Sequence, residues 1–177
     1  MSRRAVFLDR DGVINRAVIR GGKPYPPDGL ATLEILPGVS EALSRLKAAG
    51  FVLIVVSNQP DVSRGRTSRQ SVEEINDYLA KALPIDQFRT CFHDDGDNCQ
   101  CRKPRPGMLI DAARELGLDL TNSVMIGDRW RDIDAGAQAG CRTFFVDWGY
   151  DEKRPEAHDA KVESLSEACE IILGESR

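Results

Sequence analysis

Short apolar runs alternate with amphipathic segments along the chain. The runs at 5–8 and 51–56 contain no polar residue, which is typical of strands covered on both faces of a parallel sheet. Between them, residues 38–49 place apolar side chains at helical spacing and end at Gly50. The same patterns predict further strands at 88–92, 123–126 and 143–146, and further helices at 68–83, 106–116, 132–139 and 165–173.

This alternation predicts crossover units and therefore an α/β fold of the Rossmann-like kind, a three-layer sandwich. We expect a mostly parallel sheet of five or six strands with helices on both faces. No repeat, low-complexity tract or linker divides the sequence, so we interpret residues 1–177 as a single domain. Residues 16–37 and 147–161 are predicted to be long loops, and such loops in compact domains tend to carry function.

Composition narrows the class of protein. Lys and Arg number 24 against 28 Asp and Glu, and this net charge of −4 lacks the basic character of a general nucleic-acid binder. No apolar run approaches the ~18 residues of a membrane span, and the first residues lack the pattern of a signal peptide. We therefore expect a cytoplasmic protein that binds neither nucleic acid nor membrane, and we expect a monomer.

Polar side chains gather after four of the predicted strands. Ligands of open parallel sheets bind at the carboxyl ends of the strands, so these side chains are expected to line one crevice. The groups are Asp9 and Asp11, then Ser57, Asn58 and Gln59, then Arg102 and Lys103, and finally Asp128 and Arg129.

Three carboxylates in one cleft would repel one another and raise each other's pKa. Asp9, Asp11 and Asp128 therefore predict a hard divalent cation, and Mg²⁺ prefers such oxygen ligands. With Ser57 and Lys103 as donors, the set fits phosphoryl transfer. One carboxylate can act as nucleophile, while a second, protonated one serves the leaving oxygen and then activates water. An Asp-x-Asp pair alone is more often a simple turn; the other clusters, in order, favour catalysis.

The five cysteines include a cluster with a metal-binding pattern. Cys91, Cys99 and Cys101 lie close together with His93, and the odd total argues against a secreted disulfide framework. Four soft ligands favour a tetrahedral zinc site over free thiols. Because the protein fills every position, the zinc is expected to be structural. Cys141 and Cys169 are expected to be buried among apolar residues, outside this cluster.

Four segments, in order, resemble the motifs of the haloacid dehalogenase (HAD) superfamily of phosphatases. They are residues 7–15 with Asp-Arg-Asp-Gly, 56–59 with Val-Ser-Asn-Gln, 102–108 with Arg-Lys-Pro, and 124–136 with Gly-Asp-Arg. The resemblance covers essentially the whole chain. It is strongest to the small members without a cap domain, which carry a Cys-x-His…Cys-x-Cys zinc loop just before Arg-Lys-Pro.

The resemblance implies specific roles. Asp9 would be the nucleophile and Asp11 the general acid and base. Asp9, the Asp11 carbonyl and Asp128 would hold Mg²⁺, and Ser57, Asn58 and Lys103 would bind the transferring phosphoryl group. Arg102 would contact the substrate, and zinc would bind the Cys/His cluster. The residues expected to contact substrate are Asn58, Gln59, Arg102, Arg129 and Arg20.

The expected reaction is hydrolysis of a small phosphorylated metabolite through an aspartyl phosphate. A phosphorylated sugar such as heptose 1,7-bisphosphate is the first candidate, and histidinol phosphate is the alternative. Residues 16–27, with Arg16, Arg20 and Lys23, either bind a second phosphate or form an ordinary solvated basic loop. Two readings without turnover stay open: a phospho-accepting signalling domain and a zinc-bearing module that binds a phosphorylated ligand.

Overall fold

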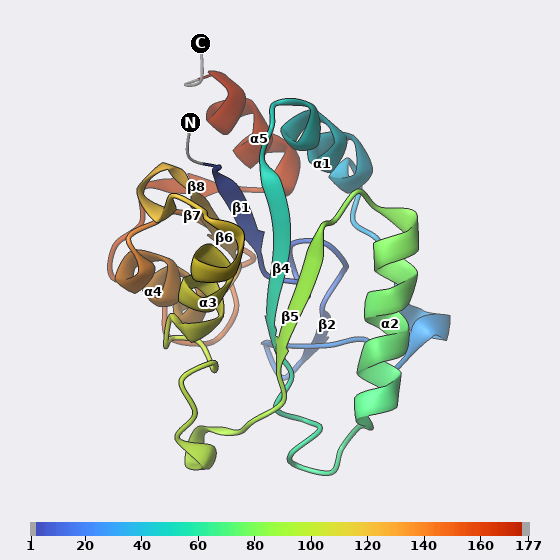
Figure 1. Cartoon of the computed structure of the whole chain (residues 1–177). Helices are drawn as coiled ribbons and strands as arrows, with labels where there is room; N and C mark the ends of the chain where they lie inside the picture. The colour runs from blue at the N-terminus through green and yellow to red at the C-terminus, as the bar shows by residue number, and fades with distance from the viewer. Residues whose placement is uncertain (1–2, 175–177) are drawn as a thin grey trace.

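A six-stranded sheet forms the centre of this computed structural model, which describes residues 3–174 (Figure 1). The strand order is β5-β4-β1-β6-β7-β8, and all neighbouring strands in it are parallel. The strands are β1 (Ala5–Leu8), β4 (Val52–Asn58), β5 (Gln87–Cys91), β6 (Val124–Gly127), β7 (Arg142–Val146) and β8 (Ala160–Val162). This confirms the predicted parallel α/β architecture.

Helices cover both faces of the sheet, which explains why its central strands lack polar alternation. Val6 and Leu8 belong to the apolar cluster on the side of α1, α2 and α5, whereas Ala5 and Phe7 face the other way, toward α3 and α4 (Figure 1). The helices are α1 (Val39–Ala48), α2 (Arg69–Ala82), α3 (Gly107–Leu116), α4 (Trp130–Ala139) and α5 (Leu165–Gly174). In the described part of the chain, no helix has the length and apolar character needed to cross a bilayer.

Residues 16–37 are not the plain loop that the sequence predicts. Val18–Arg20 and Lys23–Tyr25 form an antiparallel hairpin, β2 and β3, and the short helical turn η1 (Leu30–Thr32) follows. Gly21 and Gly22 connect the two strands with φ angles of 56° and 74°. A two-residue hairpin turn of type I′ requires positive φ at both positions, and glycine adopts it without a steric penalty. The Gly-Gly pair was the sequence signal for this hairpin.

Residues 147–161, predicted to be a loop, also differ from the prediction because the segment ends in a strand. Its last residues enter β8, which pairs with β7 from Phe144 opposite Ala160 to Val146 opposite Val162. β8 has three residues, too few to give a recognisable periodic pattern, and it forms the edge of the sheet. Helix α4 begins at Trp130, two residues before the predicted start at 132.

Candidate active site

The carboxyl ends of β1, β4 and β6 lie side by side because β1 pairs with both of the other strands. Asp9 follows β1, Asn58 ends β4 and Asp128 follows β6, so the topology brings these side chains to one edge of the sheet. A cavity of about 240 Å³ opens over them. The sequence-predicted residues that line it are Asp9, Asp11, Asn58, Gln59, Lys103, Asp128 and Arg129.

Lys103 lies at the floor of this cavity, fully buried. Its ammonium nitrogen is 2.8 Å from Asp9 Oδ1 and 2.6 Å from Asp132 Oδ1, and it donates to the Val56 carbonyl at 2.6 Å. Burial acts to lower the pKa of Lys103, but the carboxylates of Asp132 and Asp9 outweigh it and raise that pKa. The lysine is therefore a permanent cation beside the Asp9 carboxylate.

One cation does not neutralise the whole carboxylate cluster. Burial has the largest effect on the pKa of Asp9 and raises it, and repulsion from Asp132 raises it as well. Burial also has the largest effect on Asp128 and, together with repulsion from Asp9, raises the pKa of Asp128 well above its usual range. Carboxylate oxygens of Asp9, Asp128 and Asp132 lie within 4.8 Å of one another. Asp128 Oδ1 is buried without a hydrogen-bond partner. An unpartnered oxygen in an acidic cluster is the environment that a divalent cation fits.

Asp11 lies apart from this cluster, in a different environment. Its Oδ1 accepts a hydrogen bond from Asn15 Nδ2 at 3.0 Å, and its Oδ2 accepts one from Gln59 Nε2 at 2.8 Å. Arg10 adds an ion pair at 3.2 Å. The two carboxylates of the Asp-x-Asp segment thus meet different partners, a lysine for Asp9 and an array of neutral and guanidinium donors for Asp11.

The side chains at the end of β4 support the site from below. Asn58 donates through Nδ2 to the Lys103 carbonyl at 2.9 Å and accepts from the Lys103 backbone N–H at 3.0 Å, so its amide clamps the Lys103 main chain. Ser57 is buried and its hydroxyl accepts from Gln59 Nε2 at 2.8 Å. The structure therefore uses the amide groups of Asn58 and Gln59 to hold other site residues.

The three arginines expected to contact substrate lie in different places. Arg129 lines the cavity and is tied to Glu152 at 2.8 Å. Arg102 is nearly buried beside the Cys/His loop, where its Nε donates to Asp95 Oδ1 at 2.8 Å, and it lines a separate cavity. Arg20 is exposed and pairs with Asp28 at 2.7 Å. The structure brings only Arg129 of the three to the cavity over Asp9.

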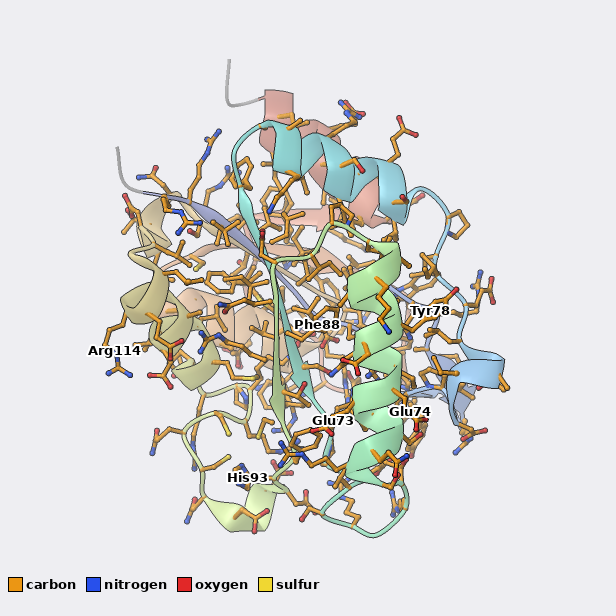
Figure 2. All side chains as sticks on the ribbon, turned by 45° about the vertical axis from the view of Figure 1, so that its right-hand side comes forward. Glu73, Glu74, Tyr78, Phe88, His93 and Arg114 are labelled. Carbon is orange, nitrogen blue, oxygen red and sulfur yellow. The ribbon has the colours of Figure 1, made fainter. Side chains whose placement is uncertain are left out.

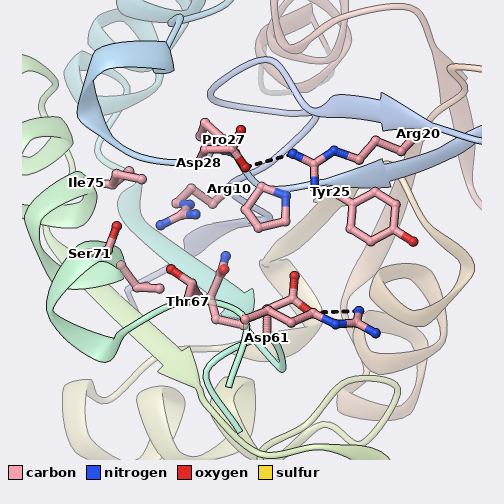
Figure 3. Close-up of a pocket in the computed structure, with 13 residues that line it drawn as sticks. Arg10, Arg20, Tyr25, Pro27, Asp28, Asp61, Thr67, Ser71 and Ile75 are labelled. Atoms are coloured by element: carbon pink, nitrogen blue, oxygen red, sulfur yellow. Dashed lines mark hydrogen bonds and ion pairs between the residues drawn. The ribbon is translucent and has the colours of Figure 1, made fainter. Parts of the chain in front are cut away.

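A second cavity, of about 350 Å³, adjoins the first and is lined by Arg20. Tyr25, Pro26, Gln59 and Asp61 line both cavities and form the wall between them. Figure 3 shows the second cavity between the β2–β3 hairpin and the start of α2, with Thr67 and Ser71 on its α2 side. The hairpin therefore covers one side of the site, which supports the expectation that residues 16–27 border it.

Sequence reasoning missed two contributors from the segment after β7. The Tyr150 hydroxyl donates to Asp128 Oδ2 at 2.7 Å, and Trp148 Nε1 donates to the Gly12 carbonyl at 2.8 Å. Gly12 has φ +89°, and a Cβ there would lie 1.9 Å from Asp128 Oδ2. The signal was present, because Trp148 and Tyr150 follow a strand of the sheet as the other site residues do.

The sequence leaves two roles open for Asp132, which can neutralise a helix dipole or support the metal ligands. It does accept from the Arg129 N–H at 3.0 Å at the start of α4. Its other oxygen binds Lys103, however, so one buried carboxylate both caps a helix and completes the cluster. Trp130 beside it does not line the cavity; Arg131 and Lys153 lie over its ring.

Cys91, His93, Cys99 and Cys101 converge in the loop after β5, and Figure 2 shows His93 at this end of the molecule. Cys91 Sγ is 3.0 Å from Cys101 Sγ and 3.7 Å from Cys99 Sγ, and His93 Nδ1 is 3.3 Å from Cys101 Sγ. Burial raises the pKa of Cys91. Burial acts to raise that of Cys99 too, but the Arg102 N–H and neighbouring thiols lower it to about 7. This donor set could hold zinc.

Comparison with known proteins agrees with the fold and with an enzyme of the phosphatase class. D-glycero-beta-D-manno-heptose-1,7-bisphosphate 7-phosphatase of Bordetella bronchiseptica is 35% identical over 158 residues, covering 85% of this chain and 84% of that protein. The enzyme of the same name from Pasteurella multocida is 32% identical and covers 97% and 98%. A crystal structure of the Bordetella bronchiseptica phosphatase with magnesium and phosphate has a TM-score of 0.84, at 31% identity and 97% and 99% coverage.

The protein has a parallel sheet with acidic side chains and a buried lysine at its carboxyl edge, and its relatives are phosphatases. Together these features define a hydrolase. Residues 27–140 match the haloacid dehalogenase-like hydrolase family, and the chain belongs to that family. The resemblance inferred from the four motifs is thereby confirmed, and so is the enzyme class.

The raised pKa of Asp128 yields a stability prediction. When a carboxyl group has a higher pKa in the folded chain than in the unfolded chain, the free energy of unfolding falls as the pH rises above the ordinary pKa of that group, here 3.8. Asp128→Asn removes that charge. Without added magnesium, we expect its free energy of unfolding at neutral pH to exceed that of the parent by about 1 kcal/mol or more.

Urea unfolding at mildly acidic and at neutral pH measures this effect, with Asp134→Asn on α4 as the control carboxylate. The difference between Asp128→Asn and the parent should grow with pH, while the control follows the parent. A less stable Asp128→Asn at neutral pH without magnesium would contradict the electrostatic account.

Proposed function

We propose that the protein hydrolyses a phosphate monoester through a phosphorylated Asp9. The observation that carries this proposal is the buried Lys103 ammonium, 2.8 Å from Asp9 Oδ1, beside the unpaired oxygen of Asp128. The Lys103 ammonium lowers the pKa of Asp9, against burial and Asp132, which raise it, and so favours the ionised, nucleophilic form of the carboxylate. The phosphatases that the chain is similar to support the same chemistry.

Mg²⁺ fits the cluster formed by Asp9 and Asp128, with the Asp11 carbonyl as the third protein ligand that the family resemblance implies. The unpartnered Asp128 Oδ1 and the solved relative with bound magnesium support this assignment. When bound, the ion would neutralise the carboxylates and the phosphoryl oxygens, so that an anion can approach Asp9. Tyr150, which holds Asp128 Oδ2, leaves Oδ1 free for this role.

The first half of the reaction transfers the phosphoryl group. A carboxylate oxygen of Asp9 attacks phosphorus, the bond from phosphorus to the leaving oxygen breaks, and Asp11 gives its proton to that oxygen. Lys103 and donors at the end of β4 near Ser57 stabilise the charge on the phosphoryl oxygens. In the second half, Asp11 takes a proton from water, the water oxygen attacks phosphorus, and the bond to Asp9 breaks.

The substrate we propose is a phosphorylated sugar that carries a second phosphate, as in heptose 1,7-bisphosphate. The curated relatives support this, because their names specify that substrate. The rim of the cavity includes Lys23, Arg64 and Arg131. Arg64 pairs with Asp94, and Arg131 with Asp95, but Lys23 has no ion-pair partner among residues 3–174. Lys23 is therefore the cation most available to a second phosphate.

We also propose that the Cys/His cluster binds structural zinc. Cys101 directly precedes Arg102 and Lys103, so the metal would fix the segment that delivers Lys103 to Asp9. All five cysteines are free of disulfides, which supports a reducing compartment such as the cytoplasm. We further propose that the protein acts as a monomer, with Asp9, Lys103 and Asp128 of a single chain forming the site.

Asp9→Asn should abolish turnover, because it removes the nucleophilic charge while keeping the shape. We expect kcat to fall by at least ~10³-fold with an unchanged circular dichroism spectrum. Continuous phosphate release from heptose bisphosphate, with histidinol phosphate as the comparison substrate, measures it. Near-normal turnover of Asp9→Asn would overturn the mechanism. A parent protein that is phosphorylated once and then stops would instead indicate a signalling or binding module.

Lys23→Ala should reduce kcat/KM for the bisphosphate by about tenfold, since one charge-assisted contact is lost. For the corresponding monophosphate the change should be less than about twofold, because the second phosphate is absent. The control is Arg16→Ala, in the same segment, which removes a cation already paired with Glu34. Equal losses on both substrates would show that Lys23 does not contact the second phosphate.

Cys101→Ser should remove zinc, lower the melting temperature and reduce activity, because the remaining ligands lose their metal and the segment carrying Lys103 loosens. Metal analysis should find about one zinc per parent chain and much less in the variant. The control is Cys141→Ser, a buried cysteine outside the cluster, which should keep its zinc. Unchanged activity and melting in protein shown to be zinc-free would exclude the structural role.

A further inference from the structure

Arg10 is a fully buried arginine that lies between the two aspartates of the site. Its guanidinium chelates Asp11, with Nε 3.2 Å from Oδ1 and Nη2 3.3 Å from Oδ2. Within residues 3–174, its ion-pair partner is Asp11. A two-point contact between a guanidinium and a carboxylate fixes the plane of the carboxylate as well as its position.

The guanidinium is held in turn from α2. Arg10 Nη1 donates to Asn76 Oδ1 at 3.0 Å, and Asn76 Nδ2 donates to Thr90 Oγ1 on β5 at 3.2 Å. Figure 3 shows the Arg10 guanidinium directed toward α2, near Ile75. Asn76 is itself buried on the apolar face of that helix. A polar side chain in such a place costs stability unless its hydrogen bonds are made, and these are.

Both ends of Arg10 are therefore fixed. Its carbonyl accepts from the backbone N–H groups of Val13, Ile14 and Asn15, which folds the segment after Asp9 around it. The same segment supplies Asn15, whose amide donates to Asp11. The chain of contacts runs from β5 through Asn76 and Arg10 to the Asp11 carboxylate, and Lys103 and Asp9 take no part in it.

We propose that Arg10 is the positioning residue for Asp11, with Asn76 as its anchor on α2. This rests on the proposed function, in which Asp11 must face the leaving oxygen in the first half of the reaction and water in the second. An aspartate side chain on a loop can rotate away from both. The guanidinium keeps the carboxylate in one place, so Arg10, which also lines the second cavity, acts through Asp11.

The test separates this role from general support of the fold by changing the leaving group. An alkyl phosphate needs a proton from Asp11 when its oxygen leaves, whereas 2,4-dinitrophenyl phosphate does not. The value of kcat/KM covers the steps up to phosphorylation of Asp9. Arg10→Lys should thus lower kcat/KM for glycerol phosphate by about 10- to 100-fold, and that for the dinitrophenyl ester by less than about threefold.

Asn76→Ala provides a second variant outside the catalytic loop, in case Arg10→Lys does not fold. It should show the same selective loss, about three- to tenfold, because Arg10 remains but its anchor is gone. Leu79→Ala, also buried on α2 and without a polar group, is the control for lost packing on that helix and should affect both esters equally. Asp11→Asn is the reference and should show the largest selective loss.

Equal losses on the two esters in Arg10→Lys or Asn76→Ala, with the selective loss retained in Asp11→Asn, would overturn the proposal while the phosphatase mechanism stands. Asn76→Ala behaving like Leu79→Ala would have the same meaning. If the parent releases no phosphate from these two esters or from heptose bisphosphate, or if Asp9→Asn hydrolyses them normally, the proposed function itself fails.

Discussion

The buried ammonium group of Lys103 is the interaction on which the rest of the site depends. Removing a lysine from water is costly, and this one is compensated by two carboxylates and a backbone carbonyl. Each partner comes from a different part of the fold: Asp9 after β1, Asp132 in α4, and Val56 in β4. Loss of the lysine would leave the buried carboxylates of Asp9 and Asp132 without their cation, and breaking a buried ion pair in this way typically costs about 3–5 kcal/mol.

This constraint explains several features around the lysine. The side-chain amide of Asn58 hydrogen-bonds to the Lys103 main chain. The last residue of the Cys/His cluster, Cys101, lies two residues before Lys103. Asp132 is both the first-turn acid of α4 and a partner of the ammonium. The opposite side of the site is organised around a different cation, Arg10, which binds Asp11. Asp9 and Asp11, two residues apart in the sequence, thus have unlike surroundings, which fits the two roles proposed for them.

Much of this arrangement could be predicted from the sequence. Unbroken apolar runs, such as the first five residues of β4, indicate a parallel sheet. The rule that ligands bind at the carboxyl ends of such strands then places Asp9, Asn58 and Asp128 together, as the cavity lining shows. The hairpin and β8 were missed because three-residue strands carry too little periodicity. The partners of Arg102 and Arg20 could not be predicted either, because a long arginine side chain can reach several carboxylates. Arg102 binds Asp95, and Arg20 binds Asp28.

The strand order also determines when the site can exist during synthesis of the chain. β1 occupies the middle of the sheet, yet one of its neighbours, β6, begins at Val124, and Lys103 is 94 residues beyond Asp9. A ribosome adds roughly 5–20 residues per second, so β1 waits for seconds as an apolar segment with one edge unpaired. No partial chain that ends before β6 can assemble the acidic cluster. Activity therefore requires synthesis to proceed beyond β6, and the nascent first half is the stage most exposed to aggregation.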